Sequence, residues 1–168
     1  VKVDQMIGDG ERLKIGNQTL TAIATPGHSP GGTSWRWTSC ENGKCLDIVY
    51  ADSISAVSAD EYRFSDHPEY VAPLRATISR VAAIKPCDIL ITPHPSASAL
   101  FERLAGEMPL VSPNGCAEYA AGAKTRLDNR LANEAAKCAL VSMDSTLKSN
   151  LSVGLPLDMV VYEANSFA

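Results

Sequence analysis

Along the first third of the chain, short runs with apolar positions read as β-strands. They are "RLKI" at 12–15, "TLTAIAT" at 19–25, "TSWRWT" at 33–38, which alternates large and small residues, and "LDIVYAD" at 46–52, which is the more buried one. Gly16-Asn17 supplies a turn between the first two runs, and Asn42-Gly43 is the strongest short hairpin signal, between the last two. This part of the chain is therefore predicted to form short strands joined by turns.

A helical period follows in "SDHPEYVAPLRATISRVAAIKP". Ser65 or Asp66 can cap this helix, with Pro68 in its first turn, and Pro86 ends it. One apolar stripe contains Val71, Leu74, Ile78 and Val81, spaced three to four residues apart. "CDILITPHP" at 87–95 then reads as a buried strand that enters a proline-bracketed loop.

The next segment, 96–114, reads as a loop with some helical content. Asn114 can cap a second long helix over about 115–137, whose inner face carries Tyr119, Ala123, Leu127 and Leu131. The order of strands, helix, strand and helix indicates an α/β fold with helices on one face of a sheet. The other face of such a sheet needs a second layer, so the chain is expected to be part of a larger sandwich.

The last part of the sequence, 138–168, changes character and is rich in Ser and Leu. It contains another strand candidate, "DMVVYEA" at 158–164. We therefore divide the chain into a domain at 1–137 and an extension of uncertain origin at 138–168.

Length and charge limit the range of functions. A chain of 168 residues is long enough for one domain with a core. Its net charge of −4 offers no basic surface for nucleic acid or an anionic membrane, and no apolar run approaches the ~20 residues of a membrane span. The sequence begins with Val1, and its first residues resemble an internal stretch of a protein, so we expect an upstream portion. No signal peptide is visible, which for this reason says nothing about the compartment of the whole protein.

The five cysteines bear on the compartment. The Asn42-Gly43 turn would bring Cys40 and Cys45 close enough to bridge. Cys87 and Cys116 could form a second bridge, which leaves Cys138. Two disulfides would indicate an exported protein, whereas the alternative is a set of five buried thiols.

Two of the three histidines occupy similar settings. His28 in "TAIATPGH" and His94 in "DILITPH" each follow a β-rich run and a proline. A histidine in a rigid loop at a strand end is a common metal ligand, although one held by hydrogen bonds in a tight turn is the alternative. The repetition favours a shared metal. His67 lies in a polar helix start and is interpreted as a surface residue.

A third polar element follows the strand at 46–52. Asp52, Ser53 and Ser55 should cluster near the same end of the sheet, where a carboxylate could bind metal and hydroxyls could bind an anionic group. The alternative is a turn in which Asp52 and Ser53 satisfy local backbone donors. The sequence contains no nucleophile-elbow pattern, phosphate-binding glycine loop or CxxC pair.

Three blocks, "TPGHSPGGTSWRW", "YADSISAVSADEYRFSDHPEY" and "CDILITPHPSAS", resemble consecutive blocks of the class B, subclass 3 metallo-β-lactamases. The resemblance covers about 1–137. It implies the C-terminal half of an αββα sandwich with a dinuclear zinc site between its two halves. It also implies zinc-dependent hydrolysis of β-lactam antibiotics, and hence antibiotic resistance, in the intact protein.

Individual residues carry over by position. His28 matches a histidine ligand of the first zinc ion and His94 one of the second. Ser53 and Ser55 match hydroxyls that hold the substrate carboxylate, while Asp52 resembles a metal-bridging acid of related thioesterases and is a weak candidate. The bridges Cys40–Cys45 and Cys87–Cys116 match those of some relatives, which implies a periplasmic or secreted protein.

The departure from the family is large, because its HxHxDH motif, which supplies most of the other zinc ligands, is absent from this sequence. A missing N-terminal half is therefore the expected partner, beside a β-lactam substrate. One alternative is a glyoxalase II-like thioesterase or lactonase of the same fold, and another is a non-catalytic half domain that needs a partner. The tail at 138–168 resembles the C-terminal part of bacterial proteasome-like peptidases of the Anbu type.

Overall fold

The computed structural model describes residues 3–59 and 61–152, and the side chains of those up to residue 140. The strand expected at 158–164 lies outside the described residues. The chain divides into two compact units, Val1–Leu131 and Ala132–Ala168. The first unit contains the sheet and every candidate site residue, so it is the unit that matters for function.

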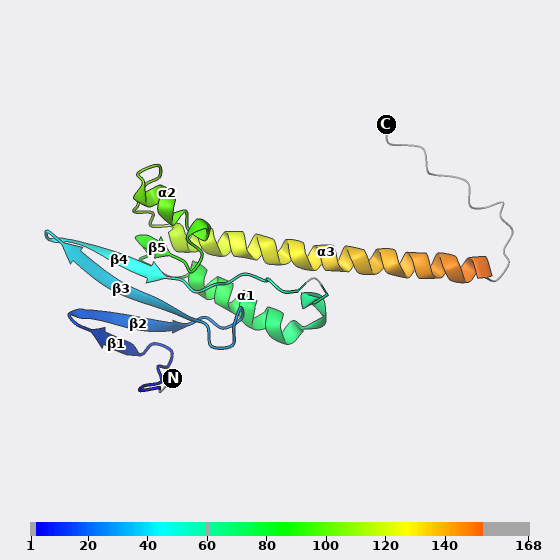
Figure 1. The fold of residues 1–168 in the computed structure, drawn as a ribbon, viewed down its shortest axis with the longest axis horizontal. Helices are drawn as coiled ribbons and strands as arrows, with labels where there is room; N and C mark the ends of the chain where they lie inside the picture. Colours follow the sequence, from blue (N-terminus) through cyan, green and yellow to red (C-terminus); the bar gives the residue numbers. More distant parts are fainter. Residues whose placement is uncertain (1–2, 60, 153–168) are drawn as a thin grey trace. The chain divides into compact units, whose positions relative to one another are not determined.

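The first unit contains one mixed sheet in the order β1-β2-β3-β4-β5 (Figure 1). Its first four strands pair antiparallel in sequence order, and β5 adds to β4 in parallel. The predicted strands are confirmed, with the bounds β1 Arg12–Ile15, β2 Gln18–Ala24, β3 Thr33–Glu41, β4 Lys44–Tyr50 and β5 Ile89–Ile91.

The predicted hairpin between β3 and β4 is confirmed. Asn42 and Gly43 have φ angles of 50° and 77°, the left-handed conformation that a tight hairpin turn requires and that these residue types tolerate. The turn places Cys40 opposite Cys45 in the strand register, and the two form a disulfide. A local turn signal therefore fixes this bridge.

Five helical segments accompany the sheet: η1 Phe64–Asp66, α1 Pro68–Ala82, η2 Pro95–Ala97, α2 Leu100–Leu104 and α3 Gly115–Ser152. The predicted cap of α1 is wrong. Ser65 and Asp66 lie within η1, and His67 occupies the N-cap position without a side-chain cap hydrogen bond. Pro68 is the first helical residue, where its missing N–H costs nothing.

The predicted end of the second long helix, near residue 137, is also wrong. Helix α3 continues through the start of the Ser- and Leu-rich segment to Ser152. The physical reason is local, because no Gly or Pro occurs between 138 and 152, and the first such residues are Gly154 and Pro156.

The core lies between one face of the sheet and the helices of the first unit. Residues of β2, β4 and β5 pack there against the inner faces of α1 and α3, and the buried set is Ile23, Val49, Leu90, Leu74, Ile78, Val81, Tyr119, Ala120, Ala123 and Leu127. Most of the apolar stripe predicted for each helix is thereby confirmed, and Leu131 packs against this core while partly buried. Val71, the first residue of the α1 stripe, is half-buried and lies outside the core cluster. The second predicted disulfide, Cys87–Cys116, is also present and joins the residues before β5 to the first turn of α3.

The opposite face of the sheet is apolar as well. Cross-strand neighbours Trp35, Tyr50 and Ile91 form one row and Trp37, Ile48 and Ile89 another, and all six side chains are half-buried. A face of this kind is what a second sheet covers in a β-sandwich. The fold is therefore α/β with helices on one face of a mixed sheet, as expected for one half of an αββα sandwich.

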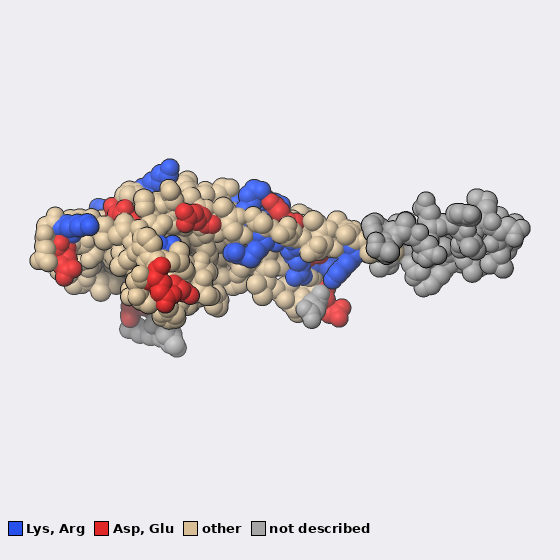
Figure 2. Space-filling model, turned by 90° about the horizontal axis from the view of Figure 1, so that it is seen from above, with Lys and Arg blue, Asp and Glu red and all other residues tan. Residues whose placement is uncertain are grey.

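Charged side chains of both signs are interspersed on the surface seen in Figure 2. This agrees with the modest net charge of −4. Among the residues that the structure describes, no helix combines the length and apolar character needed to cross a bilayer.

Candidate active site

The strand topology brings the candidate residues to one edge of the sheet. Because β2 and β4 both run antiparallel to β3, and β5 runs parallel to β4, the carboxyl ends of β2, β4 and β5 meet at that edge. His28 follows β2, the segment 52–55 follows β4, and His94 follows β5. The predicted clustering of these loops is thus a consequence of the strand order.

His28 is oriented by the loop after β4. Its Nδ1 lies 2.8 Å from the carbonyl oxygen of Ser55. Since a carbonyl oxygen only accepts hydrogen bonds, Nδ1 carries the hydrogen, and the lone pair of the neutral ring resides on Nε2. The side chain is exposed, so Nε2 is available to a ligand.

The loop that carries His28 is packed tightly on α1. Gly27 has a φ angle of 139°, and a Cβ atom there would lie 2.6 Å from the Cα of Leu74. The hydroxyl of Thr77 donates to the carbonyl oxygen of Pro26. Gly27 is therefore favoured for two reasons, namely its positive φ angle and the close approach of its backbone to the backbone of α1.

Replacing Gly27 by alanine should lower the free energy of unfolding by about 1–3 kcal/mol, the cost of a strained backbone conformation. Denaturant unfolding measures this change. Gly31→Ala is a matched control in the same loop, because a Cβ atom there meets nothing within 4 Å. Equal stability of the two variants would contradict the packing argument.

Ser53 and Ser55 form a hydroxyl pair, with 3.0 Å between their Oγ atoms. Ser53 is buried and Ser55 is half-buried. Two hydroxyls carry two hydrogens and their mutual bond uses one, so the other can be donated to an anionic ligand. The pair is thus suited to binding a carboxylate.

Asp52 takes part in backbone hydrogen bonds at both carboxylate oxygens. Its Oδ1 accepts from the N–H of Ser53 at 2.8 Å, and its Oδ2 accepts from the N–H of Thr33 at 3.2 Å. The first contact is local to the loop after β4, and the second ties this loop to the start of β3. They correspond to the structural role considered for Asp52 as the alternative to metal binding.

Tyr119 supports the same loop from α3. Its hydroxyl donates to the carbonyl oxygen of Asp52 at 3.3 Å, and burial raises the pKa of this hydroxyl, so the group stays protonated. The helical period predicts Tyr119 as a core residue. Its contact with the candidate site depends on the packing of α3 and has no sequence signal.

His94 stands in a loop that is closed by its own hydrogen bonds. The Thr92 hydroxyl donates to the carbonyl oxygen of His94 at 2.8 Å, and its oxygen lies 3.0 Å from the hydroxyl oxygen of Ser98. The imidazole is exposed. The loop is thus fixed while the ring remains available to a ligand.

His67 has a different environment, as its sequence context indicates. Its ring stacks on Tyr62 with centroids 4.5 Å apart, and its Nδ1 lies 3.0 Å from Oε1 of Glu69. The side chain is 39% exposed, which agrees with the interpretation of His67 as a surface residue.

A small cavity of about 240 Å³ adjoins His28 and Ser55. Its other walls come from Gly27 and from the segment after Ser55, namely Val57, Ser58, Tyr62, Phe64 and Tyr70. The volume is below the roughly 300–1,000 Å³ of pockets that enclose a whole ligand. The cavity, which the sequence did not predict, therefore has room for a substituent of a larger molecule.

The described residues fit only part of a zinc site. They contain no group of three or more His, Cys, Asp or Glu side chains that could hold a metal ion. Catalytic zinc usually takes three protein ligands and a water molecule. The available imidazoles of His28 and His94 are suitable donors, but the remaining ligands of a complete site are not among these residues.

Comparison with solved structures gives consistent matches, although no protein-family model matches the chain. The metallo-β-lactamase MIM-1 from Novosphingobium pentaromativorans is 48% identical, with a TM-score of 0.77 over 82% of this chain and 50% of its own. SMB-1, solved with 2-mercaptoethanesulfonate, is 47% identical, with a TM-score of 0.71 over 76% of this chain and 51% of its own.

BJP-1 of Bradyrhizobium japonicum, a subclass B3 metallo-β-lactamase, is 31% identical, with a TM-score of 0.71 over 82% of this chain and 54% of its own. The chain thus spans about half the length of the solved structures that it matches.

Proposed function

Because the chain belongs to the subclass B3 metallo-β-lactamases and spans about half the length of its solved relatives, we propose that the complete protein hydrolyses the β-lactam ring of antibiotics. The observation that carries this proposal is the 48% identity to MIM-1 over 82% of the chain, together with the convergence of His28, the serine pair and His94 at one sheet edge. In this role the protein would confer antibiotic resistance.

The two exposed histidines are assigned to zinc. His28 offers Nε2, since its Nδ1–H is donated to Ser55, and His94 offers its imidazole to a second zinc ion. When bound, zinc lowers the pKa of water to about 7, which makes hydroxide available at neutral pH. Asp52 remains a weak ligand candidate, because both of its carboxylate oxygens already accept backbone hydrogens.

Substrate binding is assigned to Ser53 and Ser55. The hydroxyl pair has one hydrogen left to donate. The pair lies close to His28, because the backbone carbonyl of Ser55 accepts the hydrogen bond from the His28 ring. A substrate carboxylate bound there would direct the lactam toward the histidines. The serines therefore orient the substrate and do not act as nucleophiles.

The remaining zinc ligands are proposed to come from an N-terminal half with an HxHxDH motif, in the same or another chain. The half-buried apolar face with Trp35, Tyr50 and Ile91 would pack against it. The two disulfides support a periplasmic or secreted location. Residues 138–168 are assigned to an extension outside the lactamase domain.

The first test compares the 168-residue chain with a fusion in which the part of MIM-1 that this chain lacks precedes Val1. We expect zinc-dependent hydrolysis of a carbapenem by the fusion and little or none by the chain alone, because the residues that the structure describes supply too few zinc ligands. A chelator should abolish the turnover. A folded, zinc-loaded fusion that leaves lactams intact would contradict the proposal.

The same experiment distinguishes the alternatives. Turnover of a thioester or lactone but not of a lactam would indicate a glyoxalase II-like hydrolase or a lactonase. A folded, zinc-loaded fusion that turns over none of these substrates, together with dye binding or self-association by the chain alone, would favour a non-catalytic half domain that needs a partner.

A further inference from the structure

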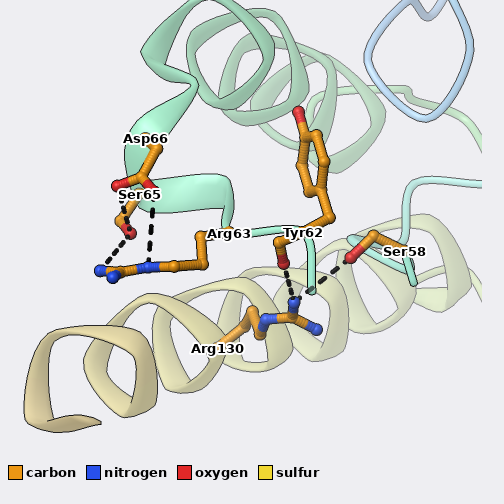
Figure 3. A network of polar contacts seen from close by, with 6 residues as sticks. All are labelled: Ser58, Tyr62, Arg63, Ser65, Asp66 and Arg130. Carbon is orange, nitrogen blue, oxygen red and sulfur yellow. Dashed lines mark hydrogen bonds and ion pairs between the residues drawn. The ribbon is translucent and has the colours of Figure 1, made fainter. Parts of the chain in front are cut away.

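Arg130 of α3 holds the segment that follows the candidate site (Figure 3). Its guanidinium donates to the carbonyl oxygen of Tyr62 at 2.6 Å and to the hydroxyl of Ser58 at 3.2 Å. The same guanidinium lies 5.4 Å from the centroid of the Phe64 ring. One side chain thus contacts three residues of one segment.

The described residues of 56–63 form neither helix nor strand, so this segment depends on contacts from elsewhere. Ile54 and Phe64 are buried on either side of it. Hydrogen bonds from a charged donor are stronger than neutral ones, and an arginine over an aromatic ring adds attraction. Arg130 therefore connects the segment to a rigid helix.

The residues contacted by Arg130 also line the cavity beside His28 and Ser55. Ser58, Tyr62 and Phe64 form part of its wall, whereas Arg130 lies outside it. His28 and Ser55 form another part of the same cavity. The geometry of this wall relative to the site thus depends on a residue that does not touch the cavity.

We propose that Arg130 is a positioning residue that fixes the wall formed by Ser58, Tyr62 and Phe64, against which the substrate rests beyond Ser55. The proposal rests on the proposed function for its substrate, but the ordering of the wall is a property of the chain alone. Substrate binding, rather than the chemical step, is what this wall supports.

Amide hydrogen exchange of the protein tests the ordering directly. In Arg130→Met, exchange within 56–66 should become about tenfold faster or more, since a hydrogen bond to a charged group is lost. Methionine has nearly the helix propensity of arginine, so α3 itself should be unaffected. The Arg130→Lys variant retains the charge and should therefore show part of the wild-type protection. Arg126→Met, an exposed position one turn earlier on α3, is the matched control and should leave 56–66 unchanged.

Unchanged exchange within 56–66 in a folded Arg130→Met variant would overturn the proposal. If that variant fails to fold, Ser58→Ala removes one of the two hydrogen bonds without altering α3. It should then accelerate exchange in the same segment to a smaller extent, and normal protection there would equally overturn the proposal.

Kinetics of the lactam-hydrolysing fusion separate positioning from general stability. Arg130→Met should raise KM about tenfold while kcat and zinc content change little, because the wall contacts substrate and not the metal ligands. A loss confined to kcat, or to the fraction of folded protein, would overturn the positioning role. A wild-type fusion without lactam turnover would refute the proposed function. The exchange experiment would still test independently whether Arg130 orders the wall.

Discussion

His94→Ala should lower the zinc content of the complete protein from two ions to about one and reduce kcat/KM by at least about 100-fold. Loss of a group that merely orients a zinc ligand typically costs about 10–100-fold, so loss of a ligand should cost more. The loop itself should survive, because its hydrogen bonds use Thr92, Ser98 and the His94 backbone. Metal analysis and steady-state kinetics on the same preparation measure both effects.

His67→Ala is the matched control for this prediction. It removes the third histidine of the chain, whose ring stacks on Tyr62 and pairs with Glu69. Its zinc content should stay at the wild-type level. Unchanged zinc content and turnover in His94→Ala, or an equal loss of zinc in His67→Ala, would remove His94 from the ligand set.

Removal of the Cys87–Cys116 disulfide should lower the free energy of unfolding by about 2–4 kcal/mol. The bridge closes a sequence separation of 29 residues, and both cysteines are only 1% exposed. Removing the bridge raises the conformational entropy of the unfolded chain and takes away the covalent link between the start of β5 and α3. Denaturant unfolding of Cys87→Ala/Cys116→Ala measures the loss without leaving buried thiols.

The hairpin disulfide provides the comparison. Cys40 and Cys45 are separated by 5 residues, already face each other in the strand register, and are exposed. The entropy that a disulfide removes from the unfolded chain is smaller for a shorter loop, so Cys40→Ser/Cys45→Ser should cost less stability than removal of the Cys87–Cys116 pair. A larger loss at the hairpin would contradict the assignment of the main stabilising role to Cys87–Cys116.

Together, these variants test separately the roles of the residues at and around this edge of the sheet. The histidines are tested by zinc content, the packing of Gly27 by stability, and the wall held by Arg130 by exchange and KM. Each readout responds to one physical cause. A failure at one residue therefore does not remove the evidence for the others.

The sequence by itself determined the local elements and the family. Strand alternation, the Asn42-Gly43 turn and the apolar stripe of α1 act over a few neighbouring residues, so their signals are complete in short windows. The motif blocks around His28 and His94 carried the resemblance, and the solved relatives confirm it. Even the length of α3 was a local property, since 138–152 contains no helix breaker, and the prediction overlooked it.

Tertiary structure alone decided how these elements act on one another. Three hydrogen bonds join residues that are far apart in sequence. They run from His28 to the Ser55 carbonyl, from the Thr33 N–H to Asp52, and from Arg130 to the Tyr62 carbonyl. No local period encodes such contacts, because they depend on strand order and on the packing of α3. The sequence therefore identified the candidate ligands, whereas the fold fixed the tautomer of His28, the hydrogen bonds of Asp52 and the wall beside the site.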